Sequence, residues 1–145
     1  MSEKSRQINA VENKALNCAQ KVFGAFCEQY GIPRDQGIQM AGALGGGLRA
    51  GEACGALVGA LLVVGLKYGT ADTDDSIQKG LCDERAKEIA FKFKEMNGHI
   101  PCRDLLGIDT SLGDNRSKAK DMGLFNDICP QIIENTVELL EEMGY

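Results

Sequence analysis

The sequence predicts an all-α protein, a single bundle-like domain of about five helices around a glycine-rich buried helix. Apolar residues recur at helical spacing in several segments, whereas no segment alternates apolar and polar residues as a half-exposed strand does. No internal repeat appears either. The chain has 145 residues, near the commonest size for one domain, so we take residues 1–145 as one helical unit.

The first expected helix runs from about Ser5 to Tyr30, because its apolar residues fall on one face of a helical wheel and its polar residues on the other. Gly31 and Pro33 follow as stop signals. A second, short helix is expected from about Asp35 to Leu44. Three consecutive glycines, residues 45–47, come next, and we expect them to allow positive φ angles or a close passage of the backbone.

The buried helix is expected to start at Glu52 or Ala53 and to end at Tyr68. Residues 53–66 are all apolar or small, but this run falls short of the ~20 residues that span a bilayer. Gly55 and Gly59 lie four residues apart, on one face of the helix. They indicate close approach of another helix, a ligand or a second copy of the chain, so a homodimer stays open.

Three further helices complete the expected bundle. They run from about Asp75 to Met96, from Cys102 to Leu106, and from about Asp127 to Met143, with Pro130 in the first turn of the last one. The segment Ile108–Gly123 is polar and is expected to be irregular, with room for one helical turn.

Charge and composition exclude several classes of function. The net charge is −5 and the basic residues are scattered, which argues against a nucleic-acid partner. The polar N-terminus carries no basic and apolar leader, so we expect a cytoplasmic protein that does not span a membrane. No Ser-His-Asp set, pair of catalytic carboxylates or nucleotide fingerprint indicates an enzyme reaction.

The six cysteines are the most informative residues. No two of them form a CxxC pair and none precedes histidine as in CxxCH, which excludes the usual zinc-ribbon, thioredoxin, ferredoxin and covalent-haem spacings. A reducing compartment rarely keeps structural disulfides, so this many cysteines indicates a metal, catalysis or core filling.

Cys54, Cys102 and Cys129 fall at expected helix starts. Free backbone N–H groups and the helix dipole favour a thiolate there, so we expect the pKa of each thiol below the free value of ~8.5. The same setting suits the sulfurs of an iron–sulfur cluster. Cys18 is expected in the middle of the first helix, at the edge of its core-facing stripe, where it can complete a set of four.

The two remaining cysteines are interpreted as core residues. Cys27 lies half a turn around the wheel from Cys18, and Cys82 lies beside Leu81 in a long helix, so burial explains both. His99, the only histidine, could ligate a metal or accept a proton, although an exposed loop position is the commoner outcome.

The pattern resembles the C_GCAxxG_C_C family of redox-active proteins, which is named for its four cysteines. The label writes the central block as GCAxxG, whereas this chain reads CGALVG, and we treat the two as the same motif. The blocks that carry the resemblance are Asn17-Cys18-Ala19-Gln20, Gly45-Gly46-Gly47, GEACGALVGA at residues 51–60, Cys102 in HIPC, and Cys129 in DIC.

The resemblance implies a redox site at Cys18, Cys54, Cys102 and Cys129. The family is often associated with transporter genes, which implies a redox partner linked to a transporter. A similar helical cysteine domain occurs in split-Soret cytochromes, which also carry an iron–sulfur cluster. This chain lacks haem attachment motifs, so the resemblance to these cytochromes implies an iron–sulfur cluster but no haem.

Four interpretations stay open at this point. The four cysteines hold an iron–sulfur cluster, or they act as metal-free redox thiols that form a disulfide. Alternatively, they bind structural zinc in an interaction module, or they are ordinary buried cysteines.

Overall fold

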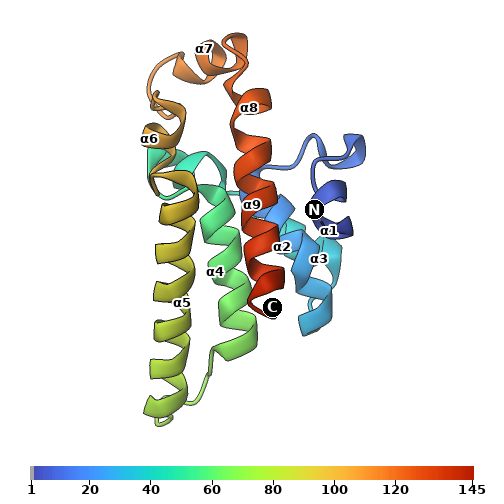
Figure 1. Ribbon diagram of the computed structural model, residues 1–145, viewed down its shortest axis with the longest axis vertical. Helices are drawn as coiled ribbons and strands as arrows, with labels where there is room; N and C mark the ends of the chain where they lie inside the picture. The colour runs from blue at the N-terminus through green and yellow to red at the C-terminus, as the bar shows by residue number, and fades with distance from the viewer. Residues whose placement is uncertain (1) are drawn as a thin grey trace.

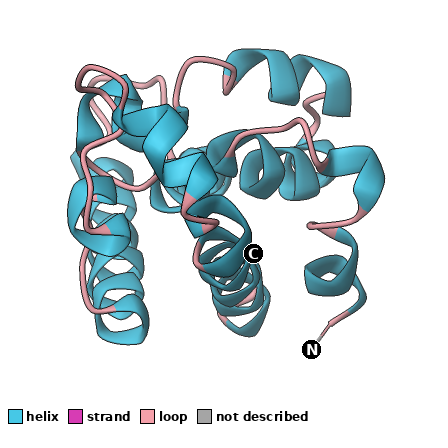
Figure 2. Cartoon of the chain, turned by 90° about the horizontal axis from the view of Figure 1, so that it is seen from above, coloured by secondary structure: helices cyan, strands magenta, loops and turns pink. Residues whose placement is uncertain are grey.

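The computed structural model describes residues 2–145, and helices and loops make up this whole range (Figures 1 and 2). Three long helices run side by side along the long axis: α4 (Gly55–Tyr68), α5 (Ser76–Asn97) and α9 (Cys129–Glu142). Helix α2 (Cys18–Phe26) packs against both α4 and α9. The all-α prediction is therefore confirmed.

The expected number of about five helices is wrong, because residues 2–145 contain nine α-helices. Several of them are too short to show a clear apolar period in the sequence. The polar segment 108–123, for example, contains a helix of two turns. The shorter elements are α1 (Glu3–Gln7), η1 (Val11–Asn13), η2 (Cys27–Tyr30), α3 (Arg34–Met40), η3 (Gly47–Gly51), α6 (Cys102–Leu106), α7 (Asn115–Asp121) and α8 (Leu124–Asp127).

The single helix expected from Ser5 to Tyr30 is also wrong. The chain turns after α1 and η1, and a new helix starts at Cys18 because Asn17 caps it. The Asn17 side chain accepts a hydrogen bond from the Gln20 backbone N–H at 2.8 Å, and the Gln20 side chain accepts one from the Asn17 N–H at 2.9 Å. This reciprocal capping box fixes the start of α2.

The other expected boundaries lie close to the observed ones. The buried helix begins at Gly55, with Cys54 as its N-cap, and ends at Tyr68 as expected. Helix α6 has the expected bounds, and α5 and α9 lie within two residues of theirs. Helix α3 ends at Met40, earlier than the expected Leu44.

The glycine face of α4 is occupied within the chain. A Cβ atom at Gly59 would lie only 2.8 Å from the Ala19 carbonyl oxygen, and one at Gly55 would lie 3.1 Å from the Cys18 Cβ. Close approach of α2 to α4 therefore explains both glycines, as the sequence predicted. Because Ala19 is fully buried there, this contact places the start of α2 beside the start of α4.

A pair of substitutions tests this contact. We expect Gly59→Ala to lower the free energy of unfolding by about 1–3 kcal/mol, because its new methyl group meets backbone atoms of α2. Gly65, in the same helix, has no neighbour within 4 Å of an added Cβ, so Gly65→Ala should raise the free energy of unfolding by about 0.5–1 kcal/mol. Urea denaturation measures both, and equal effects would contradict the packing described.

Among residues 2–145, the structure contains no helix with the length and apolar character needed to cross a membrane.

Candidate redox site

The four cysteines of the motif all lie at helix starts. Cys18, Cys102 and Cys129 are the first residues of α2, α6 and α9, and Cys54 is the N-cap of α4. The prediction of helix-start positions is thus confirmed for Cys54, Cys102 and Cys129. The mid-helix position expected for Cys18 is wrong, because the capping box begins a new helix there.

A short backbone pairing joins Cys54 to Cys102. Ala53 and Pro101 form an isolated antiparallel bridge. The Cys54 N–H donates to the Ile100 carbonyl at 2.9 Å, and the Cys102 N–H donates to the Glu52 carbonyl at 2.6 Å. The two cysteines are therefore diagonal neighbours across the bridge, a relation in which Cα atoms lie about 7–8 Å apart.

Contacts of α2 add the other two cysteines. The Cys18 Cβ lies beside Gly55, next to Cys54 in the sequence. The strongest influence on the pKa of Cys18, and also on that of Cys129, is the interaction between their two side chains. Backbone contacts and pKa interactions thus link Cys129, Cys18, Cys54 and Cys102, although they are far apart in the sequence.

A left-handed turn precedes Cys54. Gly46, Gly47, Leu48 and Arg49 have φ angles of 61°, 65°, 62° and 58°, and the left-handed region costs a non-glycine residue roughly 1–2 kcal/mol. A Cβ atom at Gly47 would lie 2.8 Å from the Cys102 Cβ and 2.6 Å from backbone atoms of Glu52. The expected roles of these glycines, positive φ and close passage, are thus confirmed at Gly47.

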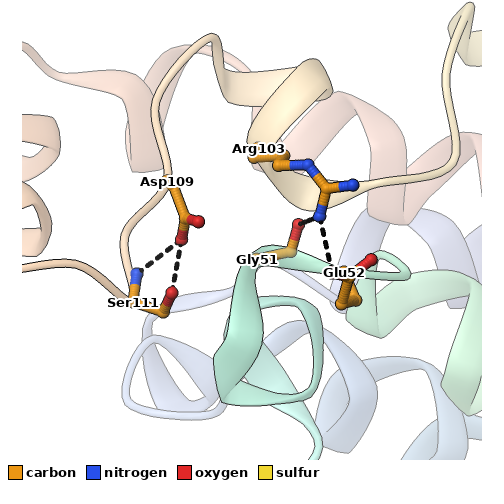
Figure 3. Close-up of polar contacts among 5 residues, drawn as sticks. All are labelled: Gly51, Glu52, Arg103, Asp109 and Ser111. Atoms are coloured by element: carbon orange, nitrogen blue, oxygen red, sulfur yellow. Dashed lines mark hydrogen bonds and ion pairs between the residues drawn. The ribbon is translucent and has the colours of Figure 1, made fainter.

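Polar contacts fasten this turn to α6 (Figure 3). One Nη atom of Arg103 donates to the Gly51 carbonyl at 3.0 Å and pairs with the Glu52 carboxylate at 2.8 Å. Nearby, the Asp109 carboxylate accepts hydrogen bonds from the backbone and hydroxyl of Ser111. Arg103 therefore adds a side-chain link between the two segments that the backbone bridge already joins.

The Cys18 thiol is the most acidic of the four. Its interaction with the Cys129 side chain lowers the pKa of Cys18 to about 7, against the effect of burial. The charges of Lys21 and Arg49 and the N–H group of Cys18 itself, at the start of α2, act in the same direction.

The other three thiols resist ionisation, which contradicts the expectation of a lowered pKa at every helix start. Burial, followed by the charge on Cys18, raises the pKa of Cys54 to about 12 and that of Cys102 to about 11. The N–H groups of Ala56 and Leu57 favour the Cys54 thiolate, but they form no capping hydrogen bond with it. The interaction with Cys18, followed by burial, raises the pKa of Cys129.

The remaining candidates differ in burial. Cys27 is fully buried in the core and faces the Gly24 and Pro33 carbonyls, while Cys82 is half-buried on α5 against the core. His99 is exposed. All six cysteines are free thiols, and in residues 2–145 no group of three or more His, Cys, Asp or Glu side chains is arranged to hold a metal ion.

The sequence analysis missed the role of Asn17 as a helix cap. The signal for this role is an asparagine three residues before Gln20, the spacing of a capping box. Its amide also donates to the Ala41 and Gly42 carbonyls, at 3.3 and 3.1 Å. We expect Asn17→Ala to lower the free energy of unfolding by about 2–3 kcal/mol, because it removes the cap and two bonds to the preceding loop.

Asn17→Ser separates the two contributions. Serine keeps an N-cap acceptor but no amide donor, so it should recover about 1 kcal/mol of that loss in thermal or urea denaturation. A serine variant no more stable than the alanine variant would argue that the cap has no role.

One comparison with known proteins gives a match. The family described as "Putative redox-active protein (C_GCAxxG_C_C)" matches residues 16–143, a range that includes all four helix-start cysteines and excludes only the ends of the chain. No match was found among curated proteins or among solved structures. The chain therefore belongs to the C_GCAxxG_C_C family of redox-active proteins.

Proposed function

We propose that this protein transfers electrons through an iron–sulfur cluster held by Cys18, Cys54, Cys102 and Cys129. One observation carries the proposal: the four thiols occupy four helix starts and each influences the ionisation of others in the set. Such mutual influence in a buried place requires that the side chains share one neighbourhood.

The raised pKa values support a cationic occupant. Thiolates are the metal-binding form of cysteine, and four negative charges in one buried site repel each other strongly. A positively charged metal centre removes this conflict, because coordination deprotonates a thiol outright. The chemistry of the donor set therefore fits a group with several metal charges.

The arrangement is compatible with a cluster. Four sulfurs around one zinc ion, each ~2.3 Å from the metal, lie about 3.8 Å from each other. In an iron–sulfur cluster the four thiolates are distributed over two or four irons, so sulfurs on different irons lie farther apart than this. The diagonal placement of Cys54 and Cys102 is compatible with that larger spacing.

The chain's own residues have distinct roles in this proposal. An iron–sulfur cluster supplies one-electron transfer when bound. The bridge between Ala53 and Pro101 fixes two of the thiols relative to each other, and the contact of Gly55 with Cys18 fixes a third. Helix-start N–H groups favour negative charge on the sulfurs of Cys18 and Cys54.

Anaerobic reconstitution with ferrous iron and sulfide tests this function. The expected product is brown, contains both iron and acid-labile sulfide, and loses visible absorbance when dithionite reduces it. Elemental analysis of the protein as purified separates iron from zinc. A protein that stays colourless and free of iron after reconstitution would end the proposal.

A second function, metal-free dithiol chemistry, is favoured by the side-chain interaction between Cys18 and Cys129. Oxidation of that pair would form one S–S bond and release two electrons and two protons to an acceptor. Cys18, with the lowest pKa, would supply the thiolate. Counting free thiols in oxidised and reduced samples of the metal-free protein decides this. A disulfide lowers the count by two in the oxidised sample, and an unchanged count would exclude this function.

A further inference from the structure

Helix α5 presents an uncovered face that carries two large apolar side chains. The helix stands at the edge of the three long helices (Figure 1), and α4 and α9 pack against one side of it. Ile89 and Phe93 are buried on that side. On the opposite side Ile77 and Phe91 are 86% and 65% exposed. These two residues lie two heptads apart and therefore on one face of the helix.

A hollow beside Phe91 has the form that helix–helix packing requires. The residues that line it are Phe91, Lys94, Glu95 and Gly98. They occupy positions i, i+3, i+4 and i+7, the four positions that surround one inserted side chain where two helices interlock. The last turn of α5 and its C-cap Gly98 therefore offer a socket for a side chain of a facing helix.

Ile77 is the side chain that matches this socket. It lies in the first turn of α5, at the other end of the same face. When two copies of α5 lie antiparallel about a two-fold axis, Ile77 of each copy can enter the hollow of the other copy. One face thus supplies both halves of the contact, as a two-fold symmetric dimer requires.

The residues between Ile77 and the hollow fit the same arrangement. Residue 77 then faces residue 94 of the second copy, residue 80 faces 91, and residue 84 faces 87. Gly80 leaves room for the ring of Phe91, because an added Cβ there would have no neighbour within 4 Å. Glycine within a helix costs about 1 kcal/mol relative to alanine, and neither a close neighbour nor a positive φ requires it here.

The charges on this face also complement each other across the axis. Glu84 and Lys87 are both exposed, and the antiparallel arrangement places Glu84 of each copy opposite Lys87 of the other. The two-fold axis repeats this pair of opposite charges. Charge pairs of this kind select a register and a partner.

We propose that this face of α5 binds a second copy of the chain in an antiparallel, two-fold symmetric dimer. Helix α5 has 22 residues and is about 33 Å long. A contact one helix wide belongs to the small, transient class of interfaces, so the dimer should dissociate on dilution. The inference does not involve the cysteines and is therefore independent of the proposed function.

Sedimentation velocity over a concentration series tests the dimer. The parent protein should change from monomer to dimer as its concentration rises. Ile77→Ala should lower the association constant about tenfold or more, because the symmetry removes the inserted side chain twice. Alanine favours the helix, so the variant should fold. A parent protein that stays monomeric at every concentration would overturn the inference and leave this face to a different partner.

Charge reversal tests the register. Lys87→Glu places like charges opposite each other and should lower the association constant about tenfold or more, and added salt should lessen the loss. Glu84→Lys combined with Lys87→Glu restores opposite charges and should bring the constant back to within about threefold of the parent value. Lys120→Glu makes the same change of net charge on α7 and should leave the dimer unchanged.

Two further outcomes would overturn the inference. A dimer that either Ile77→Ala or Lys87→Glu leaves unchanged would use another face or another register. A double variant no tighter than Lys87→Glu alone would show that Glu84 and Lys87 do not face each other.

Discussion

Cys54→Ser is expected to reduce the amount of iron bound after reconstitution at least tenfold. Removal of a residue that only supports a metal ligand already costs on the order of tenfold in metal affinity, and Cys54 is a proposed ligand itself. The serine hydroxyl is a poor substitute for a thiolate ligand of iron. The same loss is expected for serine at Cys18, Cys102 and Cys129, because each occupies one position of the site. Iron and sulfide analysis with visible absorbance measures the effect.

Cys27→Ser is the matched control. Cys27 is buried, like Cys54, and the serine hydroxyl can donate to the Gly24 or Pro33 carbonyl that the thiol faces. It should change stability but keep the full iron content. Equal iron loss in the Cys27 and Cys54 variants would contradict the assignment of the site.

Gly47→Ala is expected to lower the free energy of unfolding by about 2–5 kcal/mol. The left-handed φ of 65° contributes roughly 1–2 kcal/mol for any L-residue. The added methyl group would also meet Glu52 backbone atoms at 2.6 Å and the Cys102 Cβ at 2.8 Å, and such overpacking costs about 1–3 kcal/mol. Because relief of this clash moves Cys102, iron binding should also weaken.

Gly107→Ala isolates the conformational part of this effect. Gly107 has a φ of 73° and no neighbour within 4 Å of an added Cβ, so alanine there should cost only about 1–2 kcal/mol. Urea denaturation and iron content are measured for both variants. Equal stability losses, with equal iron, would show that the close approach of Gly47 to Cys102 has no consequence.

The sequence predicts the all-α class and several boundaries because long apolar helices and proline or glycine signals are local features. Gly55 and Gly59 also report a long-range contact, since only a close neighbour explains two glycines on one face of a buried helix. The start of α2 was missed because the apolar stripe continues past it, and the periodicity does not register the capping box formed by Asn17 and Gln20.

The ionisation of the site was beyond the reach of the sequence. The expected helix starts predict a lowered pKa for Cys54, Cys102 and Cys129, and this is wrong for all three. Among the four thiols, the pKa is lowered only at Cys18, chiefly by the interaction with the Cys129 side chain. Burial and mutual repulsion reverse the direction at Cys54 and Cys102. Both effects depend on how distant segments pack, so spacing along the chain contains no sign of them.

Anomalous diffraction at the iron absorption edge, from crystals of the anaerobically reconstituted protein, tests the central claim most directly. The account predicts iron peaks within bonding distance of the sulfurs of Cys18, Cys54, Cys102 and Cys129 and away from Cys27 and Cys82. Iron bound elsewhere, or well-ordered crystals in which those four sulfurs are scattered and hold no iron, would contradict it.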